Sequence, residues 1–117
     1  MLNMVYMLAV TFGNNKGKSF ELKEGENLVG RCDPDSDEKL AIDLDQEDLE
    51  AKVSRQHAVV LVNENSVTVE DLGSLNGTFL MCADGAQKLE PGKGYTLSEG
   101  GEIVFGKVSL KLLSANE

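Results

Sequence analysis

Short apolar runs separated by turn-forming residues constrain the fold of this chain more than any other feature of its sequence. Clusters of glycine, asparagine and aspartate divide the chain at intervals that fit short strands. The nine runs between them are rich in valine, isoleucine, leucine and phenylalanine, and each is predicted to form a β-strand: Val5–Phe12, Ser19–Leu22, Leu28–Arg31, His57–Val62, Val67–Leu72, Thr78–Met81, Tyr95–Leu97, Glu102–Phe105 and Val108–Leu113. Many short strands at this spacing are typical of sandwiches and barrels, so we predict an all-β fold, a two-sheet β-sandwich of about 10–11 short strands.

Residues 33–52 interrupt this pattern. The segment is crowded with aspartate and glutamate, carries no strand-like run, and is expected to form at most a short helical turn over Asp45–Ala51. Acidic side chains are readily solvated, so we expect one long acidic loop, an insertion at the surface of the sandwich. No linker or repeat divides the rest of the sequence, and 117 residues are the size of one ordinary domain. The sequence therefore predicts a single domain over residues 1–117.

The charge balance excludes several classes of partner. The formal net charge is −9, whereas proteins that bind nucleic acids or anionic membranes display clustered lysine and arginine. The apolar stretch at residues 1–12 is shorter than the roughly 20 residues of a membrane span and lacks a basic leader region. The two cysteines, Cys32 and Cys82, form neither a Cys-x-x-Cys pair nor a metal-ligand cluster. We expect a cytoplasmic protein with no metal, no cofactor, no nucleic-acid partner and no membrane contact.

The chain has two arginines, and both are predicted to lie at loops. Arg31 follows Gly30 at the end of a predicted strand, and Arg55 lies beside Ser54 just before the next one. A third polar turn contains Asn76. Because the loops of a sandwich gather at its two ends, these segments can converge despite their separation in sequence. A phosphoryl group carries about −1.5 to −2 charges and three acceptor oxygens, and a guanidinium group matches it in charge and geometry. The pattern therefore predicts a phosphate-binding site.

Three short blocks, in this order, resemble the forkhead-associated (FHA) domain: Gly30-Arg31, Ser54-Arg55-Gln56-His57 and Leu72-Gly73-Ser74-Leu75-Asn76-Gly77-Thr78. The resemblance covers residues 20–112, nearly the whole chain. It implies an FHA/SMAD-like β-sandwich whose end loops recognise phosphothreonine in partner proteins, without catalysis or cofactor. The chain departs from the family pattern in two places. Its acidic segment is longer than the corresponding FHA loop, and residues 80–85 lack the Asn-Gly pair that often follows in the family.

The resemblance also implies a role for each residue of the site. The phosphate would be bound by Arg31, Ser54 and Arg55. The main chain of the peptide would be held by Asn76, with Leu75 lining its approach. Structural support would come from Gly30, His57, Gly77 and Thr78. The ligand backbone is an alternative contact for Arg55, and no residue of the set would be catalytic or bind a metal.

Other interpretations of these residues are weaker. His57, the only histidine, could act as a general base toward Ser54 with Asp71 orienting it, but the sequence shows no nucleophile elbow. The two arginines could simply pair with the abundant carboxylates. Residues 13–19 resemble a nucleotide-binding Walker A loop but have one residue too few between the glycines. Residues 33–37 begin like a calcium-binding loop that then lacks the glycine and the final glutamate of that motif.

We therefore expect a non-catalytic module that binds phosphothreonine in partner proteins of Ser/Thr kinase signalling, as a monomer or as part of a larger protein. The alternative is a scaffold of the same fold that binds its partners independently of phosphorylation. A calcium-responsive structural module is a third hypothesis.

Overall fold

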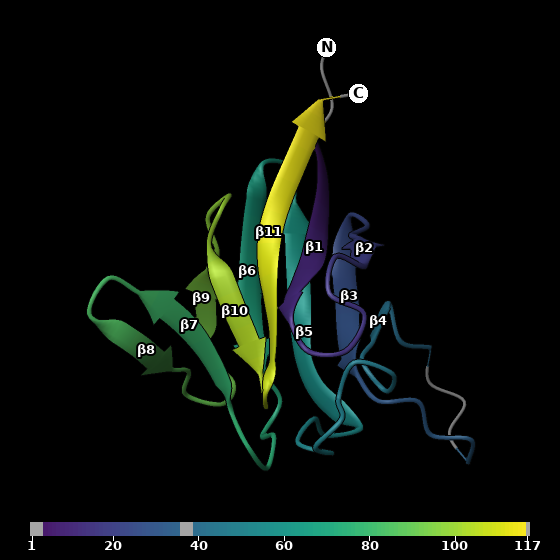
Figure 1. Ribbon diagram of the computed structural model, residues 1–117. Coiled ribbons are helices and arrows are strands. Elements are labelled where there is room, and N and C mark those ends of the chain that lie inside the picture. Colours follow the sequence, from purple (N-terminus) through teal and green to yellow (C-terminus); the bar gives the residue numbers. More distant parts are fainter. Residues whose placement is uncertain (1–3, 36–38, 117) are drawn as a thin grey trace.

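The computed structural model describes residues 4–35 and 39–116, and within them the chain forms two β-sheets (Figure 1). One sheet has six strands in the order β2-β1-β11-β10-β7-β8, and the other has five in the order β4-β3-β5-β6-β9. The strands are β1 (Met4–Phe12), β2 (Ser19–Glu21), β3 (Gly25–Gly30), β4 (Ile42–Asp43), β5 (Gln56–Asn63), β6 (Ser66–Asp71), β7 (Thr78–Cys82), β8 (Gly85–Lys88), β9 (Gly94–Thr96), β10 (Glu102–Phe105) and β11 (Val108–Asn116). This architecture confirms the predicted all-β sandwich. The two described ranges contain no helix that could span a membrane.

Alternating apolar side chains form the core. Leu8 and Val10 of β1 are buried while their neighbours in the strand are more exposed. Leu110 of β11, Val60 of β5 and Val69 of β6 are inaccessible to solvent. Every second side chain of a strand points to the same face, which explains the pattern. Because these side chains from both sheets belong to one hydrophobic cluster, the core lies between the sheets.

The nine strands predicted from the sequence are all present, with ends within three residues of the predicted ones. Prediction missed β8, in which all four residues are exposed. This strand pairs with β7 at the edge of the six-stranded sheet. It buries no side chain and therefore has no apolar alternation that a sequence pattern could reveal.

The prediction of a strandless acidic loop over residues 33–52 is wrong at its middle, where Ile42–Asp43 form β4. There β4 pairs in parallel with β3, placing Ile42 opposite Val29. Ile42 and Leu44 are fully buried. Their alternation with aspartates is a strand signal that the surrounding charge conceals. After β4 the chain forms turns, in which the Leu44 carbonyl accepts a hydrogen bond from the Asp48 N–H (2.9 Å).

Connections that carry the predicted site residues lie at one end of the sandwich, opposite the end where β1 begins and β11 finishes (Figure 1). These are the connections β3–β4, β4–β5 and β6–β7. The β10–β11 turn joins them, because the Gly106 N–H donates to the Gly77 carbonyl at 3.0 Å. We call this end of the molecule the rim.

Candidate functional site

Arg31 begins the β3–β4 connection and is anchored to the entry of β5. Its N–H donates to the Arg55 carbonyl at 3.3 Å, and its side-chain Nε donates to the Val53 carbonyl at 2.5 Å. The carboxylate of Asp48 lies 3.9 Å from the same Nε. These contacts use one of the five N–H donors of the guanidinium group. The side chain remains 32% exposed, so the structure positions the Arg31 cation at the surface of the rim.

Ser54 and Asn76 come from different loops but meet at this rim. The Ser54 hydroxyl accepts a hydrogen bond from the Leu75 N–H at 3.1 Å. The Asn76 side-chain amide donates to the Lys52 carbonyl at 3.0 Å. Lys52 and Ser54 flank Val53, whose carbonyl accepts from Arg31 Nε. These three hydrogen bonds therefore bring the three predicted segments together. The structure thus gathers a guanidinium, a hydroxyl and a carboxamide on one side of the molecule.

His57 lies beneath the rim and connects two of its loops. The side chain is fully buried, and its Nδ1 accepts a hydrogen bond from the Ser54 N–H at 3.0 Å. A ring nitrogen that accepts from an N–H carries no proton, so the proton is on Nε2, which donates to the Gly77 carbonyl 2.8 Å away. Burial lowers the pKa of His57 below its ordinary 6.5, against smaller opposing effects of that carbonyl and two nearby carboxylates.

This arrangement does not suit His57 as a general base. A base must reach the proton that it removes, and the His57 ring contacts the backbone N–H of Ser54 rather than its hydroxyl. The hydroxyl oxygen instead accepts from Leu75. The geometry gives the imidazole a positioning role in the neutral state.

Asp71 organises the β6–β7 loop, a role that sequence reasoning missed. Its carboxylate accepts hydrogen bonds from the Ser74 and Thr78 hydroxyls, both at 2.6 Å, and from the N–H groups of Gly73 (3.0 Å) and Ser74 (3.1 Å). Burial by itself raises the pKa of Asp71, but these hydrogen bonds outweigh it and hold the pKa below its ordinary 3.8. An aspartate placed two residues before Gly-Ser, as in Asp71-Leu72-Gly73-Ser74, is a recognisable turn signal, and it could have indicated this role.

Two glycines of the predicted supporting set have positions that a side chain would disturb. A Cβ on Gly30 would lie 1.8 Å from the Arg55 carbonyl oxygen. Gly77 has φ = 87°, in the left-handed region that favours glycine. At both positions the backbone lies close to another segment of the rim: Gly30 lies against Arg55, and the Gly77 carbonyl accepts from Gly106.

Arg55 is at the same rim, but its guanidinium is engaged with the acidic segment. Its Nη1 lies 3.5 Å from a carboxylate oxygen of Asp33. The Arg55 side chain is 69% exposed. Leu75, whose N–H donates to the hydroxyl of the neighbouring Ser54, is 87% exposed. Each arginine thus has a carboxylate nearby, Asp48 for Arg31 and Asp33 for Arg55. The sequence offered such pairing only in general terms, since it could not indicate which of many carboxylates would be close.

In the described parts of the chain, no group of three or more His, Cys, Asp or Glu side chains is arranged so that it could hold a metal ion. Glu38, which stands where the calcium-loop motif needs glycine, lies outside the described residues.

Comparison with known proteins agrees with this architecture. The sequence profile of the FHA domain matches residues 27–106. The oxoglutarate dehydrogenase inhibitor of Corynebacterium efficiens is 37% identical over 108 residues, which cover 92% of this chain and 65% of that protein. The glycogen accumulation regulator GarA of Mycobacterium tuberculosis is 36% identical over 108 residues, covering 92% of this chain and 57% of GarA. This chain therefore spans less than two thirds of the length of these two relatives.

A solved structure is similar in both fold and sequence. The FHA domain of the CT664 protein from Chlamydia trachomatis superposes with a TM-score of 0.70 at 32% identity, covering 93% of this chain and 96% of that domain. The curated relatives are named as an inhibitor and a regulator. The matched profile, the relatives and the two-sheet fold together show that this chain belongs to the forkhead-associated (FHA) domain family.

Proposed function

We propose that the rim binds phosphothreonine in partner proteins, and that the chain acts as a recognition module in Ser/Thr kinase signalling. FHA domains bind phosphopeptides of partner proteins. The observation that carries the proposal for this chain is the convergence of Arg31, Ser54 and Asn76, linked through the backbone of residues 52–54. A dianion with several acceptor oxygens needs a group of donors that is already assembled, and this rim presents one.

Each rim residue has a contact that suits its chemistry. The remaining N–H groups of Arg31 form a planar fork for the phosphate oxygens. The Ser54 hydroxyl supplies a further donor to the phosphate, while its oxygen continues to accept from Leu75. Asn76 carries an amide that donates and accepts together, which suits the main chain of an extended peptide. Arg55 reaches the phosphate or the peptide backbone when it leaves Asp33.

Replacing Arg31 tests the proposal. Arg31→Ala should weaken binding of a fluorescein-labelled phosphothreonine peptide, selected on an oriented phosphopeptide array, by about 2–5 kcal/mol. Anisotropy titration measures the dissociation constant. Lys111→Ala removes the same unit charge from an exposed residue of β11, and it should bind like the wild type. Thermal unfolding by circular dichroism confirms that both variants are folded. Equal affinity of Arg31→Ala and the wild type would contradict the assignment.

Peptides that differ only in the central residue separate this function from a phosphorylation-independent scaffold. Phosphothreonine should bind more tightly than phosphoserine, and unmodified threonine should bind least. A wild-type protein that binds the unmodified peptide as tightly as the phosphorylated one would favour the scaffold.

A further inference from the structure

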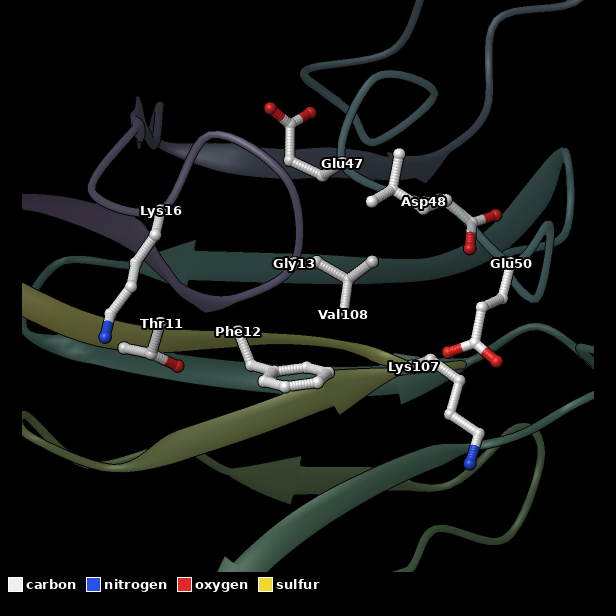
Figure 2. Close-up of a pocket in the computed structure, with 10 residues that line it drawn as sticks. Thr11, Phe12, Gly13, Lys16, Glu47, Asp48, Glu50, Lys107 and Val108 are labelled. Carbon is white, nitrogen blue, oxygen red and sulfur yellow. The ribbon is translucent and has the colours of Figure 1, made fainter.

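A groove of about 330 Å³ lies beside the rim and takes no part in the proposed phosphate site. It is formed by the end of β1, the turn that follows, residues 47–50 and the β10–β11 turn. Figure 2 shows Phe12 and Val108 at its centre. Its volume is near the lower end of the roughly 300–1,000 Å³ of ligand pockets, which is room for one or two side chains of a partner.

Large apolar side chains line this groove and remain largely in water. Phe12 is 65% exposed and Leu49 is 76% exposed, and both border the same hollow above the buried Val108. A single exposed apolar side chain is ordinary on a protein surface. Two of them facing one concave space form a surface that gains free energy when an apolar group covers it.

The groove is continuous with the proposed phosphate site through a shared wall. Asp48 lines the groove, and its carboxylate lies 3.9 Å from Nε of Arg31 on the other side. Residues 47–50 therefore form a ridge with Arg31 on one side and Phe12 on the other. A second route leads from Asn76 through the Gly77–Gly106 hydrogen bond to Lys107, which also lines the groove.

Two cations stand at the edge of this groove. Lys16 and Lys107 lie on opposite sides of Phe12 (Figure 2). Among the residues that the structure describes, no carboxylate lies within 4.0 Å of either ammonium group. Glu47 lines the groove but directs its carboxylate away from Phe12 (Figure 2). Glu50 also lines the groove and is exposed, so the exposed charged side chains here are two lysines and one carboxylate, in a chain of net charge −9.

We propose that this groove binds a hydrophobic side chain of the phosphorylated partner, flanked in the partner sequence by an acidic residue. The proposal rests on the function proposed above, because the phosphothreonine would occupy the rim while the apolar anchor crosses the ridge. Binding at two linked points raises affinity, since the second contact forms within the complex. Lys16 and Lys107 favour a carboxylate beside the anchor and disfavour a basic neighbour.

A spacing scan tests this proposal. The probes are phosphothreonine peptides with flexible Gly-Ser flanks, in which a Leu-Glu pair is moved one position at a time on either side. For the wild type, one narrow range of spacings should tighten binding by about fivefold to tenfold over the parent Gly-Ser peptide, because one leucine side chain becomes buried. Replacing the pair by Leu-Lys at that spacing should reduce the gain.

Variants locate the effect in the groove. Phe12→Ser and Leu49→Ser should bind the parent peptide like the wild type but lose the gain from the Leu-Glu pair. Both side chains are mostly exposed, so neither change removes core packing. Met81→Ser removes another exposed apolar side chain, 47% exposed on β7, and should keep the gain.

Every other outcome overturns the inference. A gain at no spacing, or a gain that survives in both groove variants, shows that the groove does not bind the anchor. If the wild type fails to bind even the parent phosphothreonine peptide, the proposed function fails and this inference with it. Self-association in sedimentation experiments that Phe12→Ser abolishes would assign the groove to a second copy of the chain instead.

Discussion

Gly30→Ala should destabilise the protein because the added methyl group has no space. Gly30 ends β3, directly before Arg31. Its Cβ would lie 1.8 Å from the carbonyl oxygen of Arg55 and 2.7 Å from the carbonyl carbon. Real Cβ atoms do not approach closer than 3.0 Å, so the backbone must separate by about 1.2 Å or more. Gly30 does not have a positive φ, so the effect is steric and not one of backbone conformation.

The expected loss of stability is about 3 kcal/mol, the upper part of the roughly 1–3 kcal/mol range for overpacking. The obstacle is backbone and not the end of a flexible side chain, which leaves little room for adjustment. The same contact includes the hydrogen bond from the Arg31 N–H to the Arg55 carbonyl. Alanine also lowers the conformational entropy of the unfolded chain. This effect stabilises the folded state by only about 0.4–1 kcal/mol and offsets a small part of the loss. A net loss of two to three kcal/mol is a large part of the roughly 5–15 kcal/mol that stabilises a domain.

Urea unfolding followed by circular dichroism measures this loss, since the chain has no tryptophan to report by fluorescence. Gly94→Ala is the matched control. Gly94 lies in a strand, has no positive φ, and a Cβ there would meet no atom within 4 Å. This variant should be as stable as the wild type or slightly more stable. If Gly30→Ala and Gly94→Ala unfold at the same urea concentration, the close approach of β3 to Arg55 is refuted.

Two further predictions concern ionisable groups. The stability of the wild type should fall as the pH drops below 6.5, because unfolded chains then take up a proton at His57 while the folded state, with its lowered pKa, does not. His57→Gln should be less stable overall, but its stability should not fall in this pH range. Urea titrations between neutral and mildly acidic pH measure the difference. A wild-type stability that does not change with pH would count against the buried neutral imidazole. Asp33→Asn should tighten phosphothreonine-peptide binding by about twofold to fivefold, because it removes the exposed ion pair that engages Arg55. Anisotropy titration measures this change, with Asp35→Asn as the control, and an unchanged or weaker affinity would contradict it.

Sequence patterns predicted the fold well wherever burial alternated along a strand. The clean alternation of Val67 and Val69 with polar residues identified β6, and both side chains prove to be buried. Where the physical signal was weak, prediction failed. The buried Ile42 of β4 is surrounded by acidic residues, and Lys88 ends a strand in which nothing is buried.

The site could be predicted only as far as chemistry and topology allow. Loops at the end of a sandwich converge, so the meeting of Arg31 with Ser54 and Asn76 could be expected before any coordinates. Contacts that depend on side-chain packing could not be predicted from the sequence. The sequence does not show that Asp48, among many carboxylates, lies beside Arg31. Nor does it show that Phe12 and Leu49 border the same groove, since they are distant in the chain and belong to different elements.

The double hydrogen bonding of His57 has a thermodynamic consequence for recognition. One rigid aromatic ring fixes the distance between the Ser54 N–H and the Gly77 carbonyl. The ring therefore ties the two loops together, and part of the entropy cost of ordering them is met when the chain folds. An incoming ligand meets a preorganised surface and has little of that ordering left to impose. Substitutions that loosen the imidazole should weaken affinity without removing any atom that touches the ligand.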